Sequence, residues 1–333
     1  MDAAWVAAAP RYPGAKTLVV SLPGVKLGSV IEYQYSKTVR AYPFFSVQLP
    51  FQGFDPVETR ELRISLPQKF KLQWSVYQDG FLRLRDRLRG QNIIHQSRSL
   101  GSREIHTWSC GPQPAVARER DLPLRQAFLP TVAANLGGWD EYREQLLKAL
   151  SFAAQGSKET LLLVQSIRRQ PEERRLLAVR NHIERAVRRA GPVFSALPWY
   201  CMSPASTTWT DGYGHSADRA ALYYSVLQEL GYNPEFVLTA SSPQDPRMEK
   251  FFLRHPAPEH FSAVLVRVET AAGEVWFNDL DQYSRLGSSS CHGCHAMRLR
   301  TGKFFRVELA SEARTRTRRV VTLNMMPGGA AEI

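Results

Sequence analysis

What the sequence has little of already excludes several classes of protein. Four cysteines in 333 residues are too few for a scaffold built on disulfides. No apolar run approaches the roughly 18 residues that a membrane-spanning helix needs. The apolar start, residues 1–10, has no basic stretch of the kind that opens a signal peptide. Zinc-finger spacing and the aromatic motif of RNA-recognition domains are also missing. We therefore expect neither a small disulfide-rich protein nor a membrane span within this chain.

The composition is that of a globular protein with a basic surface. Hydrophobic residues make up 44% and charged residues 22%, and the length suggests about two domains. The net charge of +12 raises the question of a nucleic-acid partner. However, the basic residues are spread over 83–89, 168–189 and 314–319. In 168–189 they alternate with apolar residues, and Glu184 with two other glutamates dilutes them. This pattern predicts a helix with a solvated basic face and no nucleic-acid partner.

The first third of the chain has the pattern of short β-strands. Partial alternation of apolar and polar residues marks the runs 17–22, 29–35, 61–66 and 71–76. Proline and glycine punctuate these runs as turns. We predict a β-sandwich-like domain over residues 1–125, which ends in a proline-containing connection over 105–125.

From about residue 139 the apolar residues follow helical spacing. Helices are predicted over 139–154, 172–190 and 216–230. Strands follow over 236–239, 262–268 and 274–277, with a hairpin turn at 271–273. Helices followed by strands indicate an α+β fold rather than alternating β-α-β units. A further strand over 318–324 and the start of another at Ala331 predict a C-terminal hairpin.

Several motifs occur in the order found in a known family. The stretch 22–35 (Leu-Pro-Gly-Val-Lys-Leu-Gly-Ser-Val-Ile-Glu-Tyr-Gln-Tyr), together with 51–67, Trp74 and 107–115, resembles a bacterial β-domain of unknown function. That domain usually precedes a transglutaminase-like core. The resemblance implies a transglutaminase- or papain-like α+β core over 126–310.

The resemblance also implies what lies at the two ends and where the protein works. In this family the β-domain begins further upstream, so the resemblance implies a truncated start. Residues 311–333 are expected to begin a further β-domain. Family members are often exported to the bacterial cell envelope, which implies an exported or periplasmic protein.

Active members of this family resemble cysteine peptidases. They carry a cysteine at a helix N-terminus, a histidine on a strand and an aspartate on the next strand. The family's Gly-Asp-Cys-Lys-Asp-Lys-Ala aligns with Gly-His-Ser-Ala-Asp-Arg-Ala, which puts Ser216 at the nucleophile position. Phe-Asn-His-Val-Ile-Val aligns with Phe-Ser-Ala-Val-Leu-Val, which puts Ala263 at the base position. Trp-Leu-Asp-Pro-Thr aligns with Trp-Phe-Asn-Asp-Leu, which puts Asn278 at the orienting position.

These three replacements predict a core without catalysis. Ala263 cannot accept a proton, and a serine hydroxyl without a base is a poor nucleophile near pH 7. Ser216 is then simply the N-cap of its helix, because serine is among the best N-cap residues. We expect no catalytic residues at these positions and a role in binding or scaffolding on protein or peptide.

The alternative is an active hydrolase or acyltransferase with a relocated triad that uses Ser216. His215 adjoins the serine, although adjacent side chains at a helix start diverge. His260 lies three residues before the family's base position. A one-residue slip of the alignment would bring Asp279 or Asp281 to the orienting position.

One motif is not implied by the family. The stretch Cys-His-Gly-Cys-His at 291–295 matches C-x-x-C-H, the attachment sequence of c-type haem. There, the thiols of Cys291 and Cys294 would bond the haem and His295 would ligate its iron. Met297 is too near in sequence to reach the opposite face of the iron. A haem-carrying redox module is therefore a further alternative.

Two other interpretations of the same motif stay open. Cys291 and Cys294 are either unmodified thiols or a small-loop disulfide. Alternatively, the motif supplies part of a zinc site, which Cys110 or Cys201 completes. The ligands from the motif would be Cys291, His292, Cys294 and His295.

Two further groups need only brief predictions. Trp199, Tyr200 and Trp209 are expected to cover the helix and fill a core, with an exposed aromatic loop beside the cleft as the alternative. Asp218 and Arg219, one turn into the predicted helix, are expected to pair locally, with ligand binding as the alternative.

Overall fold

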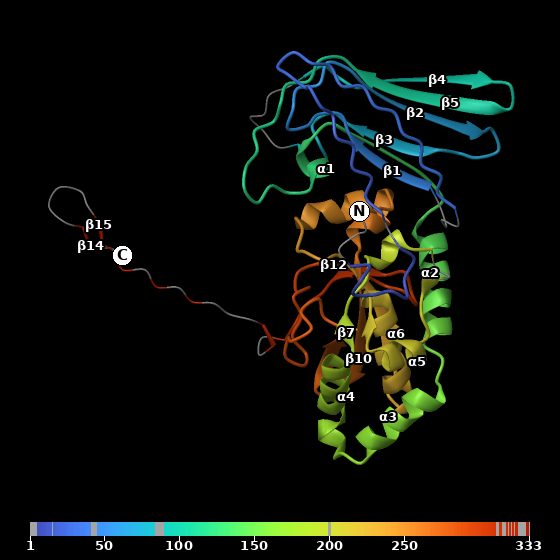
Figure 1. Ribbon diagram of the computed structural model, residues 1–333, viewed down its shortest axis with the longest axis vertical. Coiled ribbons are helices and arrows are strands. Elements are labelled where there is room, and N and C mark those ends of the chain that lie inside the picture. The colour runs from blue at the N-terminus through green and yellow to red at the C-terminus, as the bar shows by residue number, and fades with distance from the viewer. Residues whose placement is uncertain are drawn as a thin grey trace.

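The computed structural model describes most of the chain. It covers residues 5–14, 16–40, 45–83, 90–198 and 201–310, and short pieces at 313–314, 318, 320, 322, 324–325 and 331–332. A region built of strands lies above a region that combines helices with a sheet (Figure 1). None of the described helices has both the length and the apolar character that crossing a membrane requires.

Two three-stranded antiparallel sheets form the N-terminal region. The first has the order β1-β6-β3 and consists of β1 (Phe45–Pro50), β3 (Gln73–Tyr77) and β6 (Thr131–Leu136). The second has the order β2-β5-β4 and consists of β2 (Arg60–Pro67), β4 (Ile94–Leu100) and β5 (Arg103–Cys110). Alternate side chains of both sheets form one apolar cluster, which includes Phe51, Ile64, Trp108 and Val132. The predicted sandwich-like arrangement is confirmed.

Alternation in the sequence predicted two strands correctly and two that do not form. The runs 61–66 and 71–76 lie within or overlap β2 and β3. Residues 17–22 and 29–35 form no strand, and their large apolar side chains are exposed. A strand needs a neighbour for its backbone N–H and C=O groups, and the described strands provide none for these two runs. Alternation alone therefore overpredicted strands here.

The end of this region also differs from the prediction. The expected connection over 105–125 is wrong at its start, because β5 runs to Cys110 between β2 and β4. β6 lies beyond the boundary expected at residue 125, after the short helix α1 (Arg125–Phe128). It is nevertheless the central strand of the first sheet, and Val132 and Ala134 are buried in the sandwich cluster. By strand pairing, the N-terminal sheets extend to Leu136.

A five-stranded antiparallel sheet forms the centre of the core. Its order is β11-β10-β9-β12-β13, and it consists of β9 (Pro234–Thr239), β10 (Ala263–Thr270), β11 (Gly273–Phe277), β12 (His295–Arg298) and β13 (Phe304–Arg306). The strands predicted over 236–239, 262–268 and 274–277 are confirmed, as is the turn between the last two.

Helices form the rest of the core. They are α2 (Trp139–Ala153), α3 (Lys158–Arg168), α4 (Glu172–Ala186), α5 (Ala205–Asp211), α6 (Ser216–Glu229) and α7 (Glu249–Arg254). Helix α6 is buried along most of its length and packs against β9 and β10 (Figure 1). The helices predicted over 139–154 and 216–230 are confirmed, and the one over 172–190 ends early. Its last residues, Arg188–Arg189, form β7 and pair with β8 (Tyr213–Gly214) instead.

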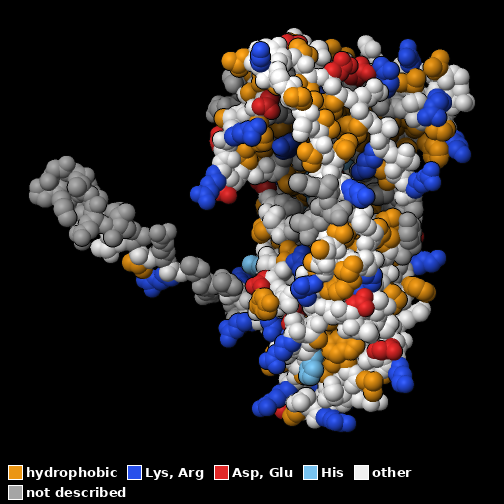
Figure 2. Space-filling model, in the orientation of Figure 1, with side chains coloured by type: hydrophobic (Ala, Val, Ile, Leu, Met, Phe, Trp, Pro, Cys, Tyr) orange, Lys and Arg blue, Asp and Glu red, His pale blue; other side chains and the backbone are white. Residues whose placement is uncertain are grey.

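On the face of the protein that Figure 2 draws, the basic residues do not gather into one patch. On the face shown in Figure 2, Lys and Arg are scattered over both the strand region and the core. On α4, Arg174 and Arg185 are exposed, whereas Val179 and Ile183 are buried. This is the amphipathic helix that the spacing predicted.

The described residues of the C-terminal stretch include a short hairpin. β14 (Asn324–Met325) pairs with β15 (Ala331–Glu332) in antiparallel register. The strand predicted over 318–324 is not formed at residues 318, 320 and 322. Residues 319, 321 and 323 of this prediction lie outside the described residues.

Candidate functional site

The start of helix α6 collects the residues that the family motif singled out. A two-residue strand, β8, leads directly into the helix, and His215 is the N-cap. The His215 ring accepts a hydrogen bond from the Asp218 backbone N–H at 3.2 Å through Nδ1. The prediction that Ser216 caps the helix is therefore wrong by one residue. The imidazole supplies the acceptor that the serine was expected to supply.

Ser216, Ala263 and Asn278 lie together, at the start of α6, the start of β10 and just after β11. The Ser216 hydroxyl accepts a hydrogen bond from the Val264 backbone N–H at 3.2 Å. Asn278 Nδ2 donates to the carbonyls of Ser216 and Val264, at 2.7 Å each. Asn278 holds a left-handed backbone with φ of 64°, which asparagine tolerates better than most residues. The side chains of Ser216 and Asn278 therefore join α6 to β10.

Arg219 extends this polar group across the core. It is fully buried, and its Nη2 donates to Glu184 Oε2 of α4 at 2.6 Å. Its Nη1 donates to the Val187 carbonyl, and its Nε donates to Asn278 Oδ1 at 3.3 Å. The hydroxyl of Tyr223 donates to the other Glu184 oxygen, and burial raises the pKa of Tyr223 well above its ordinary value.

One prediction about these charged residues is wrong, and another holds for only one of its two residues. Glu184 was expected on the solvated face of its helix, but it is buried because it pairs with Arg219. Asp218 and Arg219 were expected to pair locally. The partners of Arg219 are distant in sequence, whereas Asp218 has a local partner, His215, as well as distant ones. A charge without solvent is stable only beside an opposite charge or hydrogen bonds, and the core provides these through α4 and the N-terminal segment.

Asp218, on the other side of the helix start, is also fully buried. Its Oδ1 accepts from the Ser203 backbone N–H at 2.8 Å and lies 3.6 Å from His215 Nε2. Both ring nitrogens of His215 thus face Asp218 rather than the neighbouring serine. Burial lowers the pKa of His215, which keeps the ring neutral near pH 7.

Arg11 and Tyr12 complete this side of the site, and no signal in the sequence pointed to them. The Tyr12 hydroxyl donates to Asp218 Oδ2 at 2.6 Å and accepts from the His215 backbone N–H at 2.7 Å. Arg11 Nη2 lies 3.4 Å from the same Asp218 oxygen. More than 200 residues separate these partners in sequence, so local patterns could not have found them.

The other candidate bases and carboxylates lie elsewhere. His260 contacts Gln126 at 3.1 Å and Gln48 at 3.4 Å, both in the N-terminal region. Asp279 accepts hydrogen bonds from the loop before Cys291, and Asp281 accepts from the Tyr283 backbone N–H. Among the described residues, no imidazole nitrogen or carboxylate oxygen is hydrogen-bonded to the Ser216 hydroxyl.

The C-x-x-C-H stretch is divided by the central sheet. Cys291 and Cys294 are free, fully buried thiols. They pack with Leu265 and Trp276 on the face of the sheet away from α6. The His295 ring lies 5.7 Å from the Phe252 ring, which belongs to the cluster on the opposite face. Covalent haem requires both thiols and the imidazole at one porphyrin, so this arrangement does not fit that group.

The zinc interpretation is not supported by any convergence of ligands. In the part of the chain that the structure describes, no group of three His, Cys, Asp or Glu side chains is placed to hold a metal ion. Cys110 lies in the sandwich cluster, away from Cys291 and Cys294. His292 accepts a hydrogen bond from the Leu309 backbone N–H. Covalent haem and zinc therefore remain sequence-based expectations, without supporting geometry.

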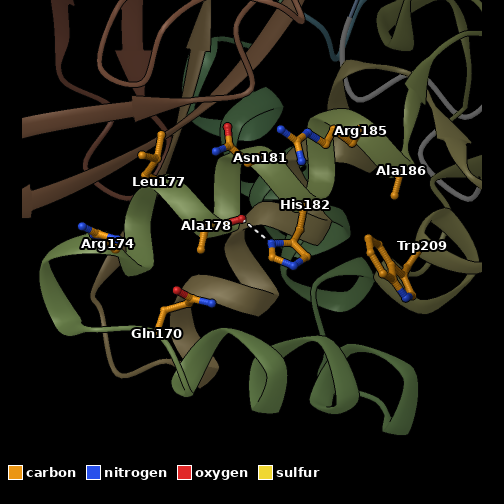
Figure 3. Close-up of a pocket in the computed structure, with 9 residues that line it drawn as sticks. All are labelled: Gln170, Arg174, Leu177, Ala178, Asn181, His182, Arg185, Ala186 and Trp209. Atoms are coloured by element: carbon orange, nitrogen blue, oxygen red, sulfur yellow. Dashed lines mark hydrogen bonds between the residues drawn. The ribbon is translucent and has the colours of Figure 1, made fainter.

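A shallow groove lies along α4 beside α5 (Figure 3). Trp209 closes one end of the groove. The His182 side chain lies between Ala178 and Trp209 and is hydrogen-bonded to the Ala178 carbonyl at 2.8 Å. Trp209 is partly buried and packs against the helical core, as its predicted covering role requires. Trp199 and Tyr200 lie outside the described residues. Ser216, Ala263 and Asn278 are not among the residues that line this groove.

Comparisons with known proteins agree with this architecture. A family model described as a domain of unknown function with solved-structure structure (DUF3857) matches residues 1–117. A crystal structure from Parabacteroides distasonis, described as a "putative protease", is 17% identical with a TM-score of 0.61. The match covers 80% of this chain and 48% of that one, so the chain spans about half the length of that protein. A "putative cysteine protease" from Cytophaga hutchinsonii is 11% identical over 70% of this chain and 78% of its own, with a TM-score of 0.30. No curated protein matches the chain.

The first of these structures shows a shared fold. The α+β class, with a sandwich-like N-terminal region followed by a core that combines helices with a sheet, is therefore confirmed. At 17% identity the likeness says nothing about which residues act. The function must be argued from the site itself.

Proposed function

We propose that this protein is a non-catalytic relative of transglutaminase-like proteins, which acts by binding protein or peptide. The observation that carries the proposal is that, in the described part of the chain, the Ser216 hydroxyl has one hydrogen bond, accepted from the Val264 backbone N–H. A serine nucleophile needs a base to take its proton, and here neither of the neighbouring positions supplies one. Ala263 has no acceptor, and the amide of Asn278 is bound to two backbone carbonyls.

The surroundings of the serine support the same conclusion. His215 is adjacent, but its Nδ1 accepts from the Asp218 N–H and its Nε2 faces the Asp218 carboxylate. It is thus oriented as a helix cap. Arg219 occupies the space behind Asn278 and binds it through Oδ1. The side chains of His215 and Arg219 are thus held in the core by hydrogen bonds, which favours a structural role.

Binding at the bacterial cell envelope is the more specific part of the proposal. It rests on the resemblance to exported proteins with this domain order. An active hydrolase with a relocated triad receives no support, because none of the hydrogen bonds among the described residues links Ser216 to a histidine or carboxylate.

The test is a comparison of the wild-type protein with Ser216→Ala. Both proteins are incubated with a glutamine-containing peptide and a labelled primary amine, and separately with activated peptide esters. We expect no turnover above the buffer rate in either protein. Ser225→Ala, at another buried serine of the same helix, controls for general effects of the substitution. Turnover by the wild type and Ser225→Ala that Ser216→Ala abolishes would overturn the proposal.

A further inference from the structure

The N-terminal segment occupies a built site at the start of α6. Tyr12 is 3% exposed although no helix or strand holds it. Its ring stacks on His215 with 4.9 Å between centroids and 15° between planes. Its hydroxyl donates to Asp218 at 2.6 Å and accepts from the His215 backbone N–H at 2.7 Å. The phenol is therefore recognised by its face and by both hydrogen-bonding functions of its oxygen.

The backbone of the core is shaped around this ring. Gly191 has φ of 104°, and a Cβ at that position would lie 2.4 Å from Tyr12 Cε2. Any side chain there would exclude the tyrosine, and the positive φ also disfavours one. We call the site formed by Gly191, Tyr213, His215 and Asp218 the tyrosine cradle.

The residue before the tyrosine is recognised as well. The Arg11 backbone N–H donates to the Tyr213 hydroxyl at 3.0 Å, and its guanidinium lies 4.6 Å from the centroid of the Tyr213 ring. Nη2 donates to the Tyr213 carbonyl at 3.0 Å, and Nη1 pairs with Asp211. The cradle therefore selects an Arg-Tyr pair, a cation followed by a phenol, through charge and geometry together.

The connection from this pair to the rest of the chain resembles a tether. Residues 17–40 form no helix or strand and are exposed throughout. The segment that carries Arg11 and Tyr12 is therefore placed mainly by its contacts with the cradle, as a bound peptide would be. Asp218 is fully buried and would lose the phenol and the guanidinium if the segment left. A vacated cradle thus favours a replacement of the same chemistry.

We infer that the tyrosine cradle is a peptide-binding site for an Arg-Tyr sequence, which the chain's own Arg11 and Tyr12 fill and a partner polypeptide fills in their place. This inference rests on the proposed peptide-binding function and names its ligand. A tethered ligand has an effective concentration on the order of millimolar, so the partner must compete with the segment in cis.

The experiment uses the full chain with the cradle emptied by Arg11→Ala/Tyr12→Ala. A fluorescein-labelled peptide with the sequence of residues 5–14, Trp-Val-Ala-Ala-Ala-Pro-Arg-Tyr-Pro-Gly, is titrated, and its anisotropy is measured. We expect saturable binding at least tenfold tighter than to the wild type. The matched control is Arg174→Ala/Tyr283→Ala, which removes an exposed arginine and an exposed tyrosine and should behave like the wild type.

Two further measurements identify what is recognised. A peptide with phenylalanine in place of tyrosine keeps the ring but loses both hydrogen bonds, so it should bind about tenfold more weakly. In the ¹⁵N-labelled wild type, excess unlabelled peptide should accelerate hydrogen exchange of the Arg11 backbone N–H, because displacement breaks its hydrogen bond to the Tyr213 hydroxyl. This second arm does not depend on the folding of any variant.

The outcomes separate this inference from the proposed function. A double variant with wild-type circular dichroism that fails to bind the peptide overturns the cradle as a site for Arg-Tyr, as does unchanged hydrogen exchange at the Arg11 N–H. Either result leaves the absence of catalysis untouched. Conversely, turnover that depends on Ser216 would contradict the proposed function even if the peptide binds.

Discussion

Two places in the core carry the side chains usually associated with chemistry, and they differ in how their polar atoms are satisfied. At the start of α6, Asp218, Arg219 and Asn278 each have hydrogen-bond partners at 2.6–3.4 Å. In the Cys291–His295 stretch, neither ring nitrogen of His295 has a partner among the described residues. The buried side chains at the start of α6 are therefore hydrogen-bonded, whereas the buried imidazole of His295 is not bonded to any described residue.

The difference shows that a motif in the sequence does not fix a site. The α6 start joins residues from a helix, two strands and the N-terminal segment, and each contact is oriented by a neighbour. In the C-x-x-C-H stretch, strand alternation sends Ala296 to the side of the thiols and Met297 to the side of the helices. The thiols and the imidazole of C-x-x-C-H would have to meet at one cofactor, but here they lie on opposite faces of the sheet. Whether the buried polar groups have hydrogen-bond partners, rather than which residues are present, distinguishes an ordered site from a chance match to a motif.

Removing the buried Arg219 should cause the largest loss of stability in either region. Arg219→Met leaves Glu184 as a buried carboxylate without its ion-pair partner, and we expect a loss of about 3–5 kcal/mol in the free energy of unfolding. Urea denaturation followed by tryptophan fluorescence measures this change.

Two further variants show whether the ion pair causes that loss. Arg174→Met, at an exposed arginine of α4, should change stability by less than about 0.5 kcal/mol. Adding Glu184→Gln to Arg219→Met should recover part of the stability, since the unpaired charge is then gone. If both arginine variants lose the same amount, the buried pair is not what holds this region together.

The predictable part of the site is the part set by short-range pattern. Ser216, Ala263 and Asn278 follow from motifs attached to a strongly periodic helix and two apolar strands, so their places on these elements could be predicted. Tyr12 could not, because its partners lie about 200 residues away and its surrounding segment has no periodicity.

The N-terminal strands illustrate the opposite error. Residues 17–22 and 29–35 have the alternation of strands but form none, since pairing depends on a neighbour that alternation does not encode. β6 was missed as a sandwich strand for the complementary reason. Its residues pair with β1 and β3, far earlier in the chain, rather than with their sequence neighbours.

His255 is a third buried histidine, and the pH dependence of stability should show that the fold keeps its ring neutral. His255 is 2% exposed, its Nδ1 lies 3.1 Å from Asn135 Oδ1 of β6, and burial lowers its pKa to about 4. The unfolded chain, with a histidine pKa near 6.5, binds this proton first. Stability conferred by the neutral ring is therefore present above about pH 6.5 and is lost as the pH falls towards 4. We expect a loss of roughly 2 kcal/mol between pH 7 and pH 5 from this group.

Urea denaturation at stepped pH values measures the effect. His255→Gln keeps an amide donor for Asn135 but removes the titration, so its stability should fall less steeply over this range. His182→Gln, at an exposed histidine of α4, is the matched control and should retain the wild-type slope. Parallel slopes for the wild type and His255→Gln would show that this imidazole is not held neutral by the fold.

Replacing a histidine with leucine in each of the two regions should change the stability of the protein in opposite directions. His215→Leu removes the N-cap acceptor of α6 and should destabilise the protein by about 1–2 kcal/mol. His295→Leu replaces a buried ring whose two nitrogens have no partner among the described residues, so it should stabilise the protein by up to about 1 kcal/mol. Met297→Leu, on the same face of β12, controls for repacking and should stay within about 1 kcal/mol of the wild type. Equal losses at both histidines in urea denaturation would mean that the imidazole of His295 is hydrogen-bonded in solution, and the distinction between the two regions would then fail.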